Sequence, residues 1–211
     1  MKNSLSKSDR LLPDTLRIDS RANNASIQLQ NFLLQQFKKI KDKPGDVVII
    51  CIGSDRATGD ALGPLIGEYL KSCALNTLIF GHLDKPVHAV NLEDYLTYIK
   101  QHHRLSPVLA IDASLGKPEE VGCVEAGSGK IEPGKGVKKE LPPVGDVFIR
   151  GVVNVGGIME NLVLQSTRLS LVMHMSSVIG RGIAGTLDMY NSKQSFSGDN
   201  KMPASSERHS V

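Results

Sequence analysis

The fold is decided by the stretch Val47-Val-Ile-Ile-Cys-Ile52, which is followed by Gly53-Ser-Asp-Arg-Ala-Thr-Gly-Asp-Ala-Leu-Gly-Pro64. Unbroken apolar residues rich in Val and Ile predict a strand that is buried on both faces of a parallel sheet. Pro64 suits the first position of a following helix, because it lacks an N–H group and its φ angle is fixed. The stretch therefore predicts a central strand, a Gly-rich loop and a helix.

The loop between this strand and this helix carries polar side chains that can take part in catalysis or ligand binding. Asp55, Arg56, Thr58 and Asp60 all fall within it. In open α/β sheets, ligands bind at the carboxyl ends of the strands, so this loop is a candidate site. Asp and Gly are also ordinary loop residues, and a purely structural loop is the alternative.

The rest of the chain alternates apolar runs with amphipathic segments. Strands are predicted at 77–80, 107–112, 121–126 and 146–155, and helices at 24–43, 64–73, 91–104, from 158 and at 174–190. The short link before 121–126 favours an antiparallel neighbour there. This alternation predicts an α/β domain with a mainly parallel sheet and right-handed crossovers.

The ends of the chain differ in composition from its middle. Residues 1–23 are polar and irregular and are expected to form a mobile N-terminal segment, residues 24–190 a single α/β domain, and residues 191–211 a disordered tail. There is no apolar signal region at the start, and no run approaches the roughly 20 apolar residues of a membrane span. A cytoplasmic protein without membrane association is expected.

The composition disfavours several classes of function and of site. Aromatic residues make up 4% of the chain and Trp is absent, which disfavours base stacking and therefore nucleic-acid binding. The net charge is +3, and much of the excess positive charge comes from lysine clusters that are typical of solvent-exposed faces. Cys51, Cys73 and Cys123 are widely spaced, so neither a disulfide framework nor a Cys-x-x-Cys metal site is indicated. Cys51 and Cys123 fit buried apolar positions better than nucleophiles.

Two aspartates form the most specific combination in the sequence. Asp60 ends the loop of the central strand, and Asp112 ends the strand predicted at 107–112, with Ser114 shortly after it. Neighbouring carboxyl groups cannot both ionise freely, so one can act as a base on water while the other donates a proton. This predicts acid–base hydrolysis without a metal. The alternative is that both aspartates only hydrogen-bond loop amides.

Other sites are weaker alternatives. The aspartates could instead bind a metal, with His82, His88 or His174 as a third ligand. Gly129-Lys-Ile-Glu-Pro-Gly-Lys-Gly136 nearly matches a phosphate-binding loop, but Gly136 stands where the Ser or Thr belongs and no helix start follows. Arg150, Asn154 and Arg168 are polar residues within apolar elements, and they either support a site or pair internally.

Several stretches resemble known families. Thr58-Gly-Asp-Ala-Leu-Gly-Pro64 and Ala110-Ile-Asp-Ala113 resemble motifs of the germination proteases, which degrade small acid-soluble proteins in spore-forming bacteria. Together with the stretches 133–146, 151–155 and 162–169, they are similar to the YyaC family of sporulation proteins over most of residues 47–190. The fold that this resemblance implies is that of the hydrogenase maturation proteases, a three-layer sandwich in which helices flank a twisted, mainly parallel sheet.

The resemblance also implies a function. The aspartates of the two germination-protease motifs are the proposed catalytic pair, which implies Asp60 and Asp112 as catalytic residues, with a protein or peptide as substrate. The nearby polar residues are then expected to bind that substrate, namely Ser54, Asp55, Arg56, Thr58 and Ser114. Ser54 stands where the maturation proteases commonly have asparagine, and their metal-binding histidine has no counterpart that the motifs identify. No metal or other cofactor is therefore expected. A noncatalytic sporulation factor that binds proteins is the alternative, and an apolar helix face leaves a homo-oligomer open.

Overall fold

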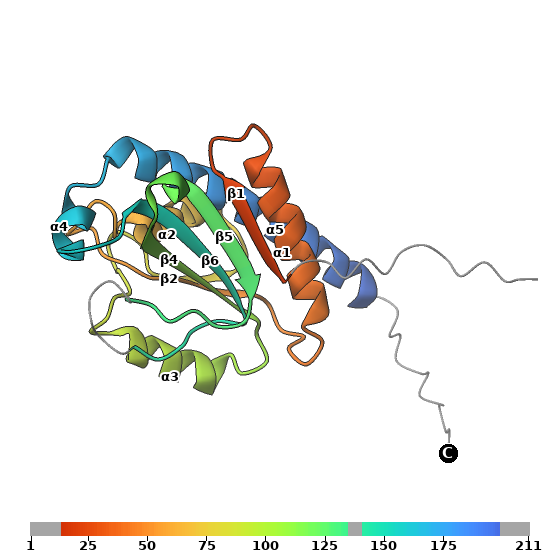
Figure 1. Ribbon diagram of the computed structural model, residues 1–211. Helices are drawn as coiled ribbons and strands as arrows, with labels where there is room; N and C mark the ends of the chain where they lie inside the picture. The colour runs from red at the N-terminus through yellow and green to blue at the C-terminus, as the bar shows by residue number, and fades with distance from the viewer. Residues whose placement is uncertain (1–13, 135–140, 199–211) are drawn as a thin grey trace, which may run out of the picture.

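The protein is built around a six-stranded sheet, as the computed structural model shows for residues 14–134 and 141–198 (Figure 1). The spatial order of the strands is β1-β5-β6-β4-β2-β3. Their bounds are β1 Thr15–Asp19, β2 Val48–Cys51, β3 Leu78–Phe80, β4 Val108–Gly116, β5 Cys123–Ser128 and β6 Val147–Val155.

The sheet is mixed but mainly parallel. Strands β3, β2, β4 and β6 run parallel to one another, whereas β5 is antiparallel to β6 and β1 is antiparallel to β5. The predicted strand at 121–126 is therefore antiparallel, as expected, but it lies between β6 and β1 rather than beside β4. Strand β6 inserts between β4 and β5 because it also pairs in parallel with β4 along most of its length.

Helices cover both faces of the sheet, which confirms the predicted α/β three-layer arrangement. Helices α1, α2 and α5 lie on one face and α3 lies on the other (Figure 1). The helical bounds are α1 Ala25–Lys39, α2 Leu62–Ser72, α3 Leu92–His102, α4 Glu160–Gln165 and α5 Leu169–Gly198, and a 3-10 turn, η1, lies at Pro118–Glu120. Among the described helices, none combines the length and the apolarity needed to cross a bilayer.

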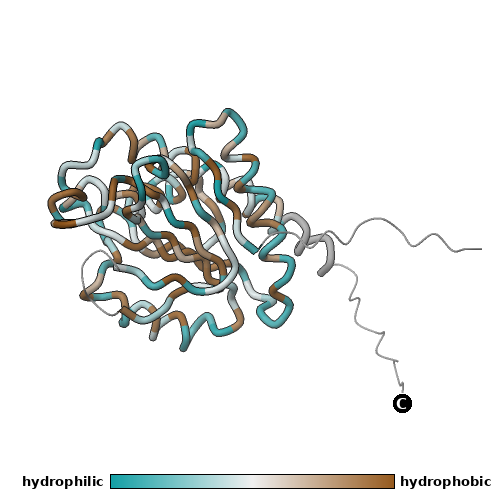
Figure 2. The backbone as a smooth tube through the Cα atoms, viewed as in Figure 1, coloured by the Kyte–Doolittle hydropathy of each residue, from teal (hydrophilic) through white to brown (hydrophobic). Residues whose placement is uncertain are grey.

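The central strand β2 packs against both layers. All four of its residues are buried; Ile49 and Cys51 face the α1, α2 and α5 layer, while Val48 and Ile50 face α3. Figure 2 shows the apolar residues gathered along the central strands, with polar residues on the outer helical surfaces. The unbroken apolar run thus reflects burial on two sides, as predicted from its composition.

The prediction that residues before 24 are irregular is wrong for Thr15–Asp19. These residues form β1, an edge strand in which Ile18 is buried and the alternate residues face solvent. Its partner β5 lies about a hundred positions further along the chain, in register with Arg17 opposite Glu125. The domain therefore begins before residue 24, while residues 1–13 lie outside the described part of the chain.

The end of the chain also differs from the prediction. Instead of one helix from 158 that covers the sheet, a short helix α4 is followed by the long helix α5, which continues to Gly198 rather than ending at 190. Ile158, Met159 and Leu162 of the α4 region are exposed, and Figure 2 shows this apolar segment at the periphery. The predicted tail from 191 is thus helical at its start, and residues 199–211 are outside the described ranges.

Candidate functional site

A cleft of about 900 Å³ lies at the carboxyl ends of β2 and β4 and extends over β6, β5 and β1. Asp60 and Asp112 both line it, so the structure brings together the two aspartates that the sequence pairs. The cleft's other charged and titratable lining residues are Arg17, Arg56, His88, Glu120, Glu125, Glu132, Arg150 and Glu160.

Asp60 is held by a tightly closed loop. Gly53 has a φ of 142°, and an added Cβ there would overlap the carbonyl oxygen of Asp60, so this close approach requires glycine. The amide of Ser54 donates to the Asp60 carbonyl at 3.2 Å, and the amide of Gly59 donates to the Leu164 carbonyl of α4 at 2.8 Å. Helix α2 begins at Leu62, two residues before the predicted start at Pro64, and this leaves Asp60 just ahead of the helix.

The carboxyl group of Asp60 is partly withdrawn from water. Burial raises its pKa, while an amide hydrogen bond from Ser54 and the nearby His88 act in the opposite direction. The Nδ1 atom of His88 accepts a hydrogen bond from the Val90 amide at 3.3 Å. In the neutral tautomer that fits this bond, the proton is on Nε2.

Asp112 lies within a strand rather than at its end. Strand β4 continues to Gly116, so the prediction that Asp112 terminates the strand is wrong, and its side chain is on the α3 side of the sheet opposite Arg150 of β6. Only 9% of the residue is exposed. Burial, followed by the negative charge of Asp60, raises the pKa of Asp112 to about 7, although amide hydrogen bonds from Gly134 and Ala113 and the charge of Arg150 favour the carboxylate.

The two carboxyl groups therefore differ in their environments. Asp112 is the more buried, and near neutral pH its carboxyl group is protonated in a substantial fraction of the protein molecules. Asp60 is more accessible and is hydrogen-bonded by an amide that favours its ionised form. Such a pair can offer one proton donor and one proton acceptor in the same cleft.

The residues predicted to bind substrate fall into two groups. Arg56 and Ser114 line the cleft, and the Ser114 hydroxyl donates to the Gly151 carbonyl at 3.4 Å. Ser54, Asp55 and Thr58 are not among the lining residues. The Ser54 hydroxyl instead accepts the amide of Arg56 at 3.2 Å, which shapes the loop.

The histidines considered as metal ligands are dispersed. His88 lines the cleft, whereas His174 is exposed on α5, with its Nε2 atom 3.0 Å from the Ser20 carbonyl oxygen. His82 lies with Glu68 and Asp84 in the one grouping of potential metal ligands found among the described residues. Its neighbour Lys71 places an ammonium group 3.4 Å from the His82 Nδ1 atom, and that charge opposes a cation.

The remaining alternatives from the sequence are placed as follows. Cys51 is fully buried, and burial raises the pKa of its thiol, which agrees with an apolar role. Cys123 is instead partly exposed. In the near match to a phosphate-binding loop, Lys135 and Gly136 lie outside the described residues.

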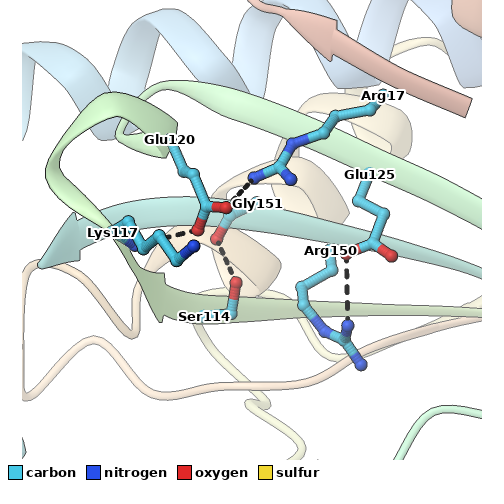
Figure 3. Close-up of polar contacts among 7 residues, drawn as sticks. All are labelled: Arg17, Ser114, Lys117, Glu120, Glu125, Arg150 and Gly151. Atoms are coloured by element: carbon cyan, nitrogen blue, oxygen red, sulfur yellow. Dashed lines mark hydrogen bonds and ion pairs between the residues drawn. The ribbon is translucent and has the colours of Figure 1, made fainter. Parts of the chain in front are cut away.

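Sequence reasoning missed a row of charged side chains on the open face of the sheet. The strand registers place Asp112 opposite Arg150, Arg150 opposite Glu125, and Glu125 opposite Arg17. We call these four residues the charge row. Figure 3 shows Arg150 beside Glu125, and Arg17 reaching Glu120. The Nη1 atom of Arg150 is 3.2 Å from a Glu125 oxygen, and the Nη2 atom of Arg17 is 2.8 Å from a Glu120 oxygen.

Comparison with known proteins identifies the family. Residues 17–182 match the family model described as "Protein of unknown function (DUF1256)". The chain belongs to this family. It is also 47% identical over 163 residues to the Bacillus subtilis (strain 168) protein YyaC, covering 77% of this chain and 78% of that protein. The resemblance to the YyaC family is thus confirmed.

One solved structure is a more distant match. The crystal structure of a [NiFe] hydrogenase maturation protease, HycI from Thermococcus kodakarensis KOD1, is similar over 72% of this chain and 99% of that one. The identity is 21% and the TM-score is 0.45.

Proposed function

We propose that the protein is a cytoplasmic peptidase of the germination-protease type in a spore-forming bacterium, and that Asp60 and Asp112 activate water for peptide hydrolysis. The observation that carries the proposal is the shared cleft of the two aspartates, in which the charge of Asp60 adds to burial in raising the pKa of Asp112. Perturbed pairs of this kind occur preferentially at catalytic sites. The resemblance of both aspartate motifs to the germination proteases supports the same assignment.

The environments assign different roles to the two groups. The Asp60 carboxylate takes a proton from a water molecule as the water oxygen bonds to the peptide carbonyl carbon. Asp112, which holds a proton, donates it to the carbonyl oxygen, so the tetrahedral intermediate carries two hydroxyl groups. When the C–N bond breaks, Asp60 returns its proton to the leaving nitrogen, and Asp112 recovers a proton from one hydroxyl as the carbonyl reforms.

The test uses the purified full-length chain and an acid-soluble protein extract from spores, with mass spectrometry to detect new peptide ends. Wild-type protein should generate new ends, and Asp60→Asn or Asp112→Asn should lower the rate by about 10²- to 10⁴-fold. Asp84→Asn is the matched control, because Asp84 is exposed and does not line the cleft. The proposal predicts that a chelator leaves the rate unchanged.

The same variants separate this proposal from a noncatalytic binding role. If the protein only binds partners, both asparagine variants should support sporulation and germination as well as wild-type protein, because asparagine keeps the shape of the side chain. If the protein is a peptidase, both variants should lose that function while Asp84→Asn retains it. Equal behaviour of all three variants would contradict the catalytic role.

A further inference from the structure

The cleft extends from the aspartate pair onto a part of the sheet that none of the described helices covers. Helix α3 packs on β2, β4 and the start of β6, and the core cluster on this face includes no residue of β5 or β1 (Figure 1). The charge row runs across this open area, and three of its side chains remain accessible: Arg150, Glu125 and Arg17 are exposed by 30%, 35% and 51%. A surface of charged side chains beside the proposed catalytic pair is therefore available to a bound molecule.

The dimensions of this surface suit an extended peptide. The charge row crosses from β4 to β1 over three inter-strand intervals, which is about 14 Å at the usual spacing of about 4.8 Å. An extended chain advances about 3.4 Å per residue, so the row spans about four residues of substrate. Such a segment would start at the aspartate pair and continue over β6, β5 and β1.

The charge of the cleft selects among such peptides. Among the described residues, those that line it carry six carboxyl groups, from Asp60, Asp112, Glu120, Glu125, Glu132 and Glu160, against three guanidinium groups, from Arg17, Arg56 and Arg150. Two of the three arginines already contact carboxylates of the cleft, in the pairs Arg150–Glu125 and Arg17–Glu120. The chain as a whole has a formal charge of +3, so the cleft is acidic on a basic protein.

We propose that this open sheet face, which we call the docking face, binds an extended substrate segment that carries lysine or arginine side chains. It is defined by Arg17, Glu120, Glu125 and Arg150. The proposal rests on the proposed peptidase function, because it assigns the segment next to the scissile bond. Complementary charge is expected to favour such segments over neutral or acidic ones, and salt is expected to weaken the preference.

Binding can be measured without turnover on the Asp112→Asn variant. Asparagine imitates the protonated form of Asp112 and leaves the charge of Asp60 and of the docking face in place. Three fluorescent decapeptides of matched sequence, with Lys, Gln or Glu at alternate positions, serve as probes in anisotropy titrations. At low salt the Lys peptide should bind about tenfold more tightly than the Gln peptide, and this ratio should shrink in high salt.

Charge variants locate the binding surface. In the Asp112→Asn background, Glu125→Gln should lower the affinity for the Lys peptide several-fold, because it removes one acidic group and leaves Arg150 without that partner. Glu119→Gln makes the same charge change on an exposed residue that does not line the cleft, and it should have no effect. Equal binding of the three peptides, a preference for the Glu peptide, equal effects of the two variants, or no binding at all would each overturn the proposal.

This design keeps the two proposals distinguishable. A charge preference that maps to Glu125 in the inactive variant, with no hydrolysis by wild-type protein, would support the docking face and refute the peptidase. Hydrolysis that is indifferent to lysine content in the substrate would support the peptidase and refute the docking face.

Discussion

Replacing Asp112 with asparagine should stabilise the protein at alkaline pH. The pKa of Asp112 is raised from 3.8 to about 7, so the folded state binds its proton more tightly than the unfolded state does. For a carboxyl group shifted in this direction, stability is lost as the pH rises from the unfolded pKa, and the full loss is present above the folded pKa. At about 1.4 kcal/mol per pKa unit, the loss near pH 8 is about 4 kcal/mol.

Asparagine avoids this loss because it has no charge to bury, and its carbonyl oxygen can still accept the amides of Gly134 and Ala113. Thermal unfolding of Asp112→Asn at pH 8 should therefore occur about 10 °C above wild type, whereas at pH 4 the two should nearly coincide. Asp84→Asn is the control, since Asp84 is exposed and should show no such pH dependence. A variant that is less stable than wild type at pH 8, or equally shifted at both pH values, would refute the reasoning.

Two further predictions follow from the same geometry. If Asp112 acts as the proton donor while Asp60 is ionised, kcat/KM should fall about tenfold per pH unit above pH 7. The Arg150→Gln variant should shift this fall to higher pH, because it removes a positive charge that favours the Asp112 carboxylate. The Arg150→Lys variant keeps the charge and should keep the wild-type pH profile. Gly63→Ala should lower the unfolding free energy by about 1–3 kcal/mol in denaturant titrations, since the added Cβ would overlap the Ile52 carbonyl oxygen, and an unchanged midpoint would contradict this packing.

The central part of the fold was predictable because its signals are local. The apolar run of β2 and the Gly-rich loop before α2 lie next to each other in the sequence, and parallel strands place their carboxyl ends at one edge of the sheet. Asp60 and Asp112 could therefore be paired without knowing the order of the strands. The same argument placed Arg56 and Ser114 at this edge of the sheet, where both line the cleft.

The elements that were missed depend on distant contacts. Strand β1 has only five residues and gains its stability from pairing with β5 far along the chain, which no local pattern reveals. The break between α4 and α5 is fixed from outside the helices, because the Asn154 amide on β6 donates to the Val163 carbonyl and to the Thr167 hydroxyl, both at 3.1 Å. A pattern of apolar spacing contains no information about such a side chain.

The charge row could not be predicted for a related reason. Its residues come together only because β6 lies between β4 and β5, whereas the short link between β4 and β5 suggested that those two strands pair directly. Arg150 was recognised as polar within an apolar strand, but its partners were set by register. Arg17 belonged to a segment that was predicted to have no strand at all.

Asp112 links the stability of the fold to the proposed chemistry. Among the buried residues of the described chain it is the only carboxylic acid, and it lies where the cover of α3 gives way to the open docking face. An apolar residue or an amide at this position would fold without burying an ionisable group, so the acid lowers stability at neutral and alkaline pH. The cleft also places a second carboxyl group close enough to oppose ionisation further. Structural needs alone do not explain why two such groups share one cleft, whereas the proposed proton transfer near neutral pH uses both of them.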